Sequence, residues 1–133
     1  MKRVTVALTV SVFGLGVGPS WGHHSPTMFD HDKEVTFEGV VKEFQYTNPH
    51  SWLLVDVTND DGSVTTWGFE AEGPTRLRLA GIRKADLPPG TKLTITGNPM
   101  KDGRPGAAWI TATTEDGREI NPRRPLEGFS VPD

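Results

Sequence analysis

The sequence predicts an all-β fold, a small five-stranded Greek-key barrel of the OB type with one short helix between its third and fourth strands. Five runs of residues alternate between apolar and polar side chains, which is the pattern of strands with one buried face. A single helix-like segment separates the third run from the fourth, as in OB barrels. The first run is the longest and contains Gly39, which predicts a bulge or bend that lets both sides of a barrel share this strand. A plain β-sandwich is the alternative.

The five runs cover residues 34–46, 51–58, 64–71, 92–97 and 107–114. In the second run, Leu53, Val55 and Val57 share one face, and Trp52 lies on the other and is interpreted as a core or barrel-face aromatic. Residues 59–62, Asn-Asp-Asp-Gly, form the turn to the third run because glycine supplies the positive φ of a tight hairpin.

The helix is expected within residues 74–81. Pro74 is tolerated in a first helical turn, and Gly81 is a residue that commonly ends a helix. After residue 118 the chain has several prolines and few apolar residues, so residues 119–133 are predicted to form a Pro-rich extended tail. The barrel domain itself is predicted to span residues 34–118.

Residues 1–22 have the three parts of a secretory signal peptide. Lys2 and Arg3 form the positive start, an apolar stretch follows, and Ser20-Trp21-Gly22 has the small-x-small pattern of a cleavage site. The apolar stretch contains three glycines and is short for a membrane span. The sequence therefore predicts a periplasmic or secreted protein with no stable membrane anchor after cleavage.

The composition indicates which partners the protein is expected to bind and how the fold is stabilised. The 133 residues carry a formal net charge of −3, and removing Lys2 and Arg3 makes it more negative, which argues against nucleic-acid binding. The chain has no cysteine, so an exported form has no disulfide and depends on its apolar core. The mature part is long enough to form such a core.

All four histidines lie between positions 23 and 50. His23 and His24 stand at the expected cleavage site, His31 follows in an N-terminal arm of residues 23–33, and His50 belongs to the motif Asn48-Pro49-His50-Ser51-Trp52. Neutral imidazole is the commonest protein ligand for copper, zinc and nickel. The concentration of histidines predicts a metal site, with copper as the metal, and Asp30 as an acceptor that orients a ligand ring.

Processing would add another ligand. Cleavage after Gly22 places a free α-amino group and an imidazole on His23, and His50 would then complete a three-nitrogen set. Cleavage after Ser20 instead gives Trp21-Gly22-His23, in which the amine, two backbone nitrogens and the imidazole suit Cu(II) in a square plane. The sequence leaves both cleavage sites open.

The two histidine motifs together resemble a family of small exported bacterial proteins of unknown function. Its members have a His-His-Ser mature start followed by a β-domain with an Asn-Pro-His-(Ser/Ala)-Trp motif. Trp67 and the turn Pro89-Gly90 also fit that family. The resemblance covers about residues 23–118 and implies an exported β-domain, but it implies no activity.

Three other interpretations stay open. The histidines can be ordinary polar residues, with His50 pinning the turn before its strand. The domain can be a non-catalytic interaction or assembly module that binds a peptide, a glycan or a neighbouring subunit. An oxidative copper enzyme is a further alternative, although a module without catalysis is favoured. Glu70 and Glu72 fall on one strand face and are interpreted as solvated edge charges rather than an acid–base pair.

Overall fold

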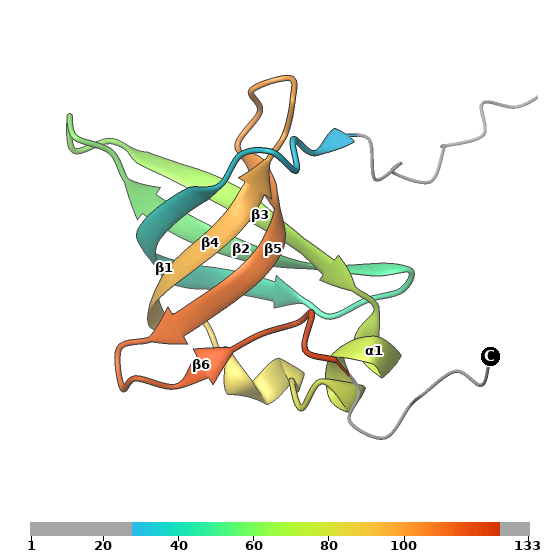
Figure 1. Ribbon diagram of the computed structural model, residues 1–133. Coiled ribbons are helices and arrows are strands. Elements are labelled where there is room, and N and C mark those ends of the chain that lie inside the picture. The colour runs from blue at the N-terminus through green and yellow to red at the C-terminus, as the bar shows by residue number, and fades with distance from the viewer. Residues whose placement is uncertain (1–27, 126–133) are drawn as a thin grey trace, which may run out of the picture.

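The computed structural model describes residues 28–125, and within them the chain forms a closed barrel of five main strands (Figure 1). The expected signal peptide, His23 and His24 lie outside the described residues. The elements in chain order are β1 (Val35–Gln45), β2 (His50–Thr58), β3 (Val64–Glu72), α1 (Pro74–Leu79), the 3-10 helix η2 (Lys84–Asp86), β4 (Lys92–Pro99), β5 (Gly106–Thr114) and β6 (Glu119–Ile120).

The strand order β3-β2-β1-β4-β5 is closed by a parallel pairing between β3 and β5. β1 makes this possible because its first half pairs with β4 and its second half with β2, with Val40 taking part in both ladders. The prediction of a small OB-like barrel is therefore confirmed, and α1 lies between β3 and β4 within the expected segment.

Gly39 lies next to Val40, where β1 passes from its pairing with β4 to its pairing with β2, so the predicted sharing of this strand is confirmed. The register of β1 against β2 shifts between Val41 and Glu43, so the bulge lies beyond the glycine. A Cβ atom at Gly39 would lie 2.5 Å from Val55 Cγ1 and 2.8 Å from the Asp56 carbonyl oxygen. The absence of a side chain therefore lets β1 cross close over β2.

The barrel interior follows the alternation of the strands. Leu53, Val55 and Val57 of β2, which share one face of the strand as predicted, are the residues of β2 that face the interior. The buried tryptophan of the core is Trp109 of β5, which is 1% exposed. Trp52 is partly buried on the outer face of β2, the barrel-face position of the two that the sequence left open. It covers Gly68 of β3, where a Cβ would be 3.1 Å from its ring.

The predicted tail begins as part of the sheet. Glu119 and Ile120 form β6 against β5, and Ile120 is only 5% exposed. Gly117, at φ +84, reverses the chain after β5 so that the Ile120 side chain reaches the core. The barrel thus extends two residues past its predicted end, and residues 126–133 of the tail lie outside the described residues.

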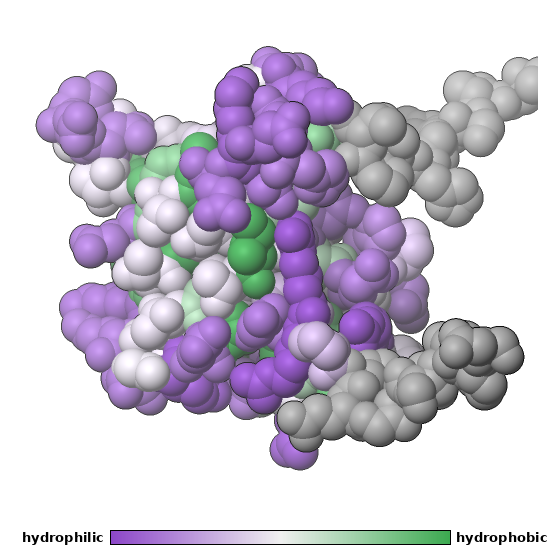
Figure 2. Space-filling view, viewed as in Figure 1, coloured by the Kyte–Doolittle hydropathy of each residue, from purple (hydrophilic) through white to green (hydrophobic). Residues whose placement is uncertain are grey.

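The surface of the domain is mainly hydrophilic on the face shown in Figure 2. Among residues 28–125 the large hydrophobic side chains that stay exposed are Val40, Val64 and Leu79, on three different elements. Hydrophobic residues scattered singly in this way are normal for a protein surface. Within the same residues, no helix is long and apolar enough to cross a membrane.

Candidate functional site

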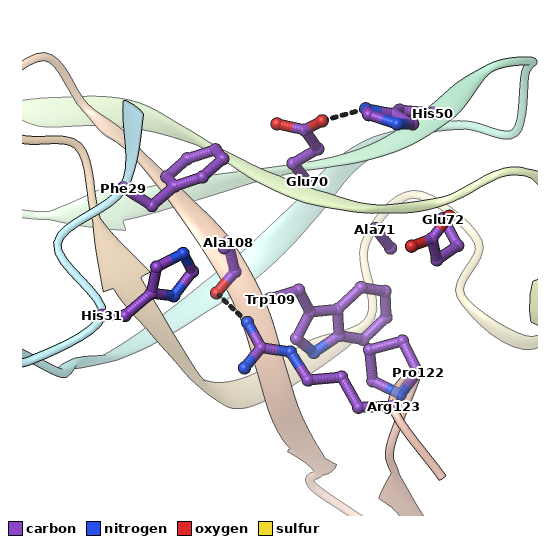
Figure 3. A pocket seen from close by; sticks show the side chains of 10 residues that line it. All are labelled: Phe29, His31, His50, Glu70, Ala71, Glu72, Ala108, Trp109, Pro122 and Arg123. Atoms are coloured by element: carbon purple, nitrogen blue, oxygen red, sulfur yellow. Dashed lines mark hydrogen bonds and ion pairs between the residues drawn. The ribbon is translucent and has the colours of Figure 1, made fainter. Parts of the chain in front are cut away.

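A cavity of about 190 Å³ lies where the two strands that close the barrel separate. The parallel pairing of β3 with β5 ends at Glu70 and Ala108, and the cavity is lined by residues from there onwards and by both ends of the described chain (Figure 3). Its polar and aromatic lining residues are Phe29, His31, His50, Glu70, Glu72, Trp109 and Arg123. Two of the predicted metal ligands therefore reach one cavity from distant parts of the sequence.

His50 is held by a carboxylate. It is the first residue of β2 and pairs with Glu72, so Glu70, two residues earlier in β3, lies on the same face of the sheet. His50 Nδ1 donates a hydrogen bond to Glu70 Oε1, as Figure 3 shows. Glu70 is 8% exposed, whereas the His50 side chain is 36% exposed. In a neutral ring this bond places the proton on Nδ1 and leaves Nε2 unprotonated.

In His31, as in His50, the proton is placed on Nδ1, but the acceptor is a different residue. Asn98, which is 4% exposed, donates from Nδ2 to the Lys33 carbonyl oxygen at 2.8 Å, and this identifies Oδ1 as its acceptor atom. His31 Nδ1 lies 3.4 Å from that oxygen and must be the donor. Arg123 Nη2 donates to the same oxygen at 3.2 Å, and burial lowers the pKa of the Arg123 guanidinium. Asn98 thus ties the arm to the C-terminal segment.

The arm itself is fixed to the turn between β4 and β5. The Met28 carbonyl oxygen accepts from Lys101 N at 2.9 Å, and Asp30 N donates to the Pro99 carbonyl oxygen at 2.8 Å. The Asp30 carboxylate lies 2.9 Å from Lys33 Nζ, and this hydrogen bond lowers the pKa of Asp30. Asp30 was expected to orient a histidine, but its carboxylate is engaged by Lys33, and Asn98 holds His31 instead.

Two buried polar atoms of cavity-lining residues lack a hydrogen-bond partner among the described residues. They are Glu70 Oε2 and Trp109 Nε1. A buried polar group without a partner is costly, and a buried carboxylate more so. Glu70 Oε2 can accept from a donor or contact a cation, and Trp109 Nε1 can donate to an acceptor.

The predicted ligands are only partly brought together. His31 and His50 line the cavity, whereas His23 and His24 lie outside the described residues. Within residues 28–125, no group of three or more His, Cys, Asp or Glu side chains is arranged to hold a metal ion. A complete copper site would need a further ligand from outside this range.

The burial of Glu70 differs from the prediction made from the sequence. This residue was interpreted as a solvated edge charge, yet it is buried and bonded to His50. A signal was present: the turn at residues 59–62 pairs Thr58 with Val64, and counting outward from that pair places His50 opposite Glu72 and diagonally beside Glu70. Counting paired residues does not predict that Glu70 is buried. The cavity beside it is also lined by residues of the arm and of the C-terminal segment, which are not part of the β2–β3 hairpin.

Asn98 provides a test of how the arm is held. Replacing Asn98 by Ala is expected to lower the free energy of unfolding by about 1–3 kcal/mol, because the Lys33 carbonyl and Arg123 lose a buried partner. Trypsin should also cut sooner after Lys33. Urea unfolding and timed proteolysis measure both effects. Asn59→Ala, which removes two hydrogen bonds from an exposed turn, is the control, and an equal loss in both variants would contradict a special role for Asn98.

Comparison with known proteins identifies a family. Residues 12–108 match a family of unknown function, DUF6152, and the matched range includes both histidine motifs and β1 to β4. No curated protein and no solved structure matches the chain significantly. Because the family match covers well over half of the sequence, the chain belongs to the DUF6152 family of unknown function.

Proposed function

We propose that this protein is an exported metal-binding module that holds one Cu(II) ion at the cavity, without catalysis of its own. His50 supplies one imidazole, and His23, as the first residue after cleavage behind Gly22, supplies an imidazole and its α-amino group. His31 or His24 completes the set. The protein would act in the periplasm or outside the cell.

The observation that carries this proposal is that His31 and His50 line the same cavity and have the same ring nitrogen, Nδ1, hydrogen-bonded to an acceptor. Both line one cavity, and each has its Nδ1–H held by an outer acceptor, Asn98 for His31 and Glu70 for His50. Metal-ligating histidines are usually oriented in this way, by a carboxylate or carbonyl on the nitrogen that does not bind the metal. In a neutral ring the Nε2 atoms are then the unprotonated nitrogens, which bind divalent copper, zinc and nickel.

His23 is within reach of this cavity. It precedes Phe29, a residue of the cavity wall, by six positions. An extended chain covers up to about 3.3–3.6 Å per residue, so these positions span up to about 20 Å. Adding the amine and imidazole of His23 to two body histidines gives a nitrogen-rich set, which favours Cu(II) over Zn(II) and Ni(II).

Titration of the exported protein tests the proposal. We expect one equivalent of Cu(II), bound more tightly than Zn(II), with nitrogen hyperfine structure in the electron paramagnetic resonance spectrum. Mass spectrometry should find His23 as the first residue. Inserting one alanine before His23 displaces the amine and should weaken binding about 10–100-fold, the range typical of a perturbed metal site.

The outcomes separate the alternatives. Equal Cu(II) affinity with and without the inserted alanine would contradict a site that uses the terminal amine. No Cu(II) binding together with concentration-dependent self-association would favour an assembly module. Peroxide formation from ascorbate and oxygen by the copper-loaded protein would favour an oxidative enzyme over a module without catalysis.

A further inference from the structure

We infer that one end of the barrel, formed by α1, η2 and the segment after β5, docks on the anionic surface of a lipid membrane. This surface, the basic end, comprises residues 74–86 and 118–124. Docking there goes beyond the proposed copper site and requires no metal.

Charge is distributed unevenly over the domain. The basic end contains seven lysine or arginine residues and two acidic residues, whereas the rest of residues 28–125 contains five and thirteen, respectively. The sequence outside residues 28–125 adds two acidic residues, Glu127 and Asp133, which are too few to cancel the positive excess of the basic end. The formal net charge of −3 therefore conceals a strongly positive surface.

The fold brings the two segments of the basic end together. Arg118 Nη2 donates to the Asp86 carbonyl oxygen at 2.7 Å, and Arg118 Nη1 lies 3.6 Å from the Asp86 carboxylate. Gly81, which follows α1, lines a small cleft together with Asn121 and Arg124. Figure 1 shows α1, η2 and β6 at the same end of the barrel. The cations of the two segments therefore belong to one surface.

Several cations of the basic end are not engaged by the fold. Arg118 is paired with Asp86, and Arg123 donates to Asn98. The exposed cations that form no ion pair with a carboxylate of residues 28–125 are Arg78, Arg83, Lys84 and Arg124. Most of these are arginines, whose planar guanidinium group can donate to two phosphate oxygens at once. The basic end therefore suits a surface of phosphate groups.

Leu79 favours a lipid surface over a purely ionic partner. It directly follows Arg78 in α1 and is 61% exposed, whereas Leu77 is buried in the core. At a membrane interface an apolar side chain enters the boundary with the acyl chains, while neighbouring cations stay beside the phosphates. A soluble polyanion offers no such apolar layer.

The acidic remainder of the domain sets the orientation of docking. Because the rest of residues 28–125 is rich in carboxylates, an anionic surface attracts the basic end and repels the remaining faces. The attraction acts within a Debye length, about 10 Å at 0.1 M salt, so it depends on the cations nearest the lipid. Docking of this kind is reversible and needs no membrane-spanning segment.

Co-sedimentation of the metal-free exported protein with lipid vesicles tests this docking. We expect binding to vesicles of phosphatidylglycerol mixed with phosphatidylcholine, release as NaCl is raised, and no binding to phosphatidylcholine alone. Arg78→Gln combined with Lys84→Gln should lower the partition coefficient about 30-fold, since each cation near an anionic surface contributes about fivefold.

The matched control is Lys101→Gln combined with Arg104→Gln. It removes the same charge from the turn between β4 and β5, at the opposite end of the barrel (Figure 1). The partition coefficient should then change by less than about twofold. Equal partition coefficients for the two double variants, or equal binding of the parent to both kinds of vesicle, would overturn the inference.

Leu79→Ser tests the apolar contact. It should weaken vesicle binding about 5–10-fold, because the exposed leucine loses its burial in the interface. Val64→Ser is its control, since Val64 is 60% exposed but lies outside the basic end, and it should bind like the parent. Equal binding by these two variants would remove Leu79 from the docking surface.

Circular dichroism checks that each variant is folded, and the salt dependence of the parent needs no variant. No vesicle binding, together with self-association that Arg78→Gln and Lys84→Gln abolish, would overturn the lipid assignment in favour of a second copy of the chain. Because the protein is metal-free throughout, a failure of the copper site leaves this test intact.

Discussion

Replacing His50 by alanine is expected to lower the affinity for Cu(II) by about 100-fold or more while the barrel stays folded. Loss of an outer partner of a ligand typically costs about 10–100-fold in affinity, and loss of the ligand itself should cost at least the upper end of that range. His50 stands at the start of β2 and is partly exposed, so the core residues of that strand keep their packing. Competition titration measures the affinity, and circular dichroism the fold.

Some loss of stability accompanies this change, because Glu70 Oε1 loses its partner as well. A buried acceptor without a partner costs about 1–3 kcal/mol, which a stable domain tolerates. Thr58→Ala is the matched control, since Thr58 is exposed at the far end of the same strand. An affinity for Cu(II) that is the same in His50→Ala, Thr58→Ala and the parent would refute His50 as a ligand.

Phe69→Ala is expected to produce the largest loss of stability, about 3–5 kcal/mol, because a fully buried aromatic side chain leaves a cavity in the core. Phe69 pairs with Ala107 in the parallel contact that closes the barrel, and a Cβ at Gly97 would lie 3.2 Å from its ring. Neighbouring strands thus pack too closely around it for the space to collapse fully. Small domains are stable by only about 5–15 kcal/mol in total.

The decrease should appear as a lower urea midpoint at an unchanged slope. Val64→Ala, on the same strand but 60% exposed, should change the free energy of unfolding by no more than about 0.5 kcal/mol. Comparable losses in the two variants would contradict a core centred on the closing strands. Because Phe69 is the neighbour of Glu70, the variant should also bind Cu(II) more weakly at temperatures near its Tm.

The barrel could be predicted because its signals are local. Alternation alone grouped Leu53, Val55 and Val57 on one face of β2, and the turn at residues 59–62 set the register of β2 against β3. Pro74 and Gly81 bracketed α1 for equally local reasons. Strands, turns and helix ends of this kind depend on backbone preferences and on the alternation that gives a strand one buried face. A few neighbouring residues are enough to specify both.

Contacts between residues that are distant in the sequence were harder to predict. Trp52 and Trp109 stand in similar strand patterns, yet only Trp109 is fully buried, because the side of each strand that faces the core depends on how the sheet closes. β6 was missed because a two-residue strand has no period to detect and is held by its partner β5. These outcomes follow from packing between segments that are distant in sequence.

The sequence by itself determined the β-rich scaffold and the candidate ligands: histidines concentrated before residue 51, and no cysteine. Only the tertiary structure decided that His31 and His50 line one cavity, that Asn98 and Glu70 set the protonated nitrogen of each ring, and that Glu70 is buried. The physical reason is that burial and these hydrogen bonds depend on contacts between segments that are distant in the sequence. Three separate parts of the chain, the arm, β3 and the segment after β6, meet to create that space.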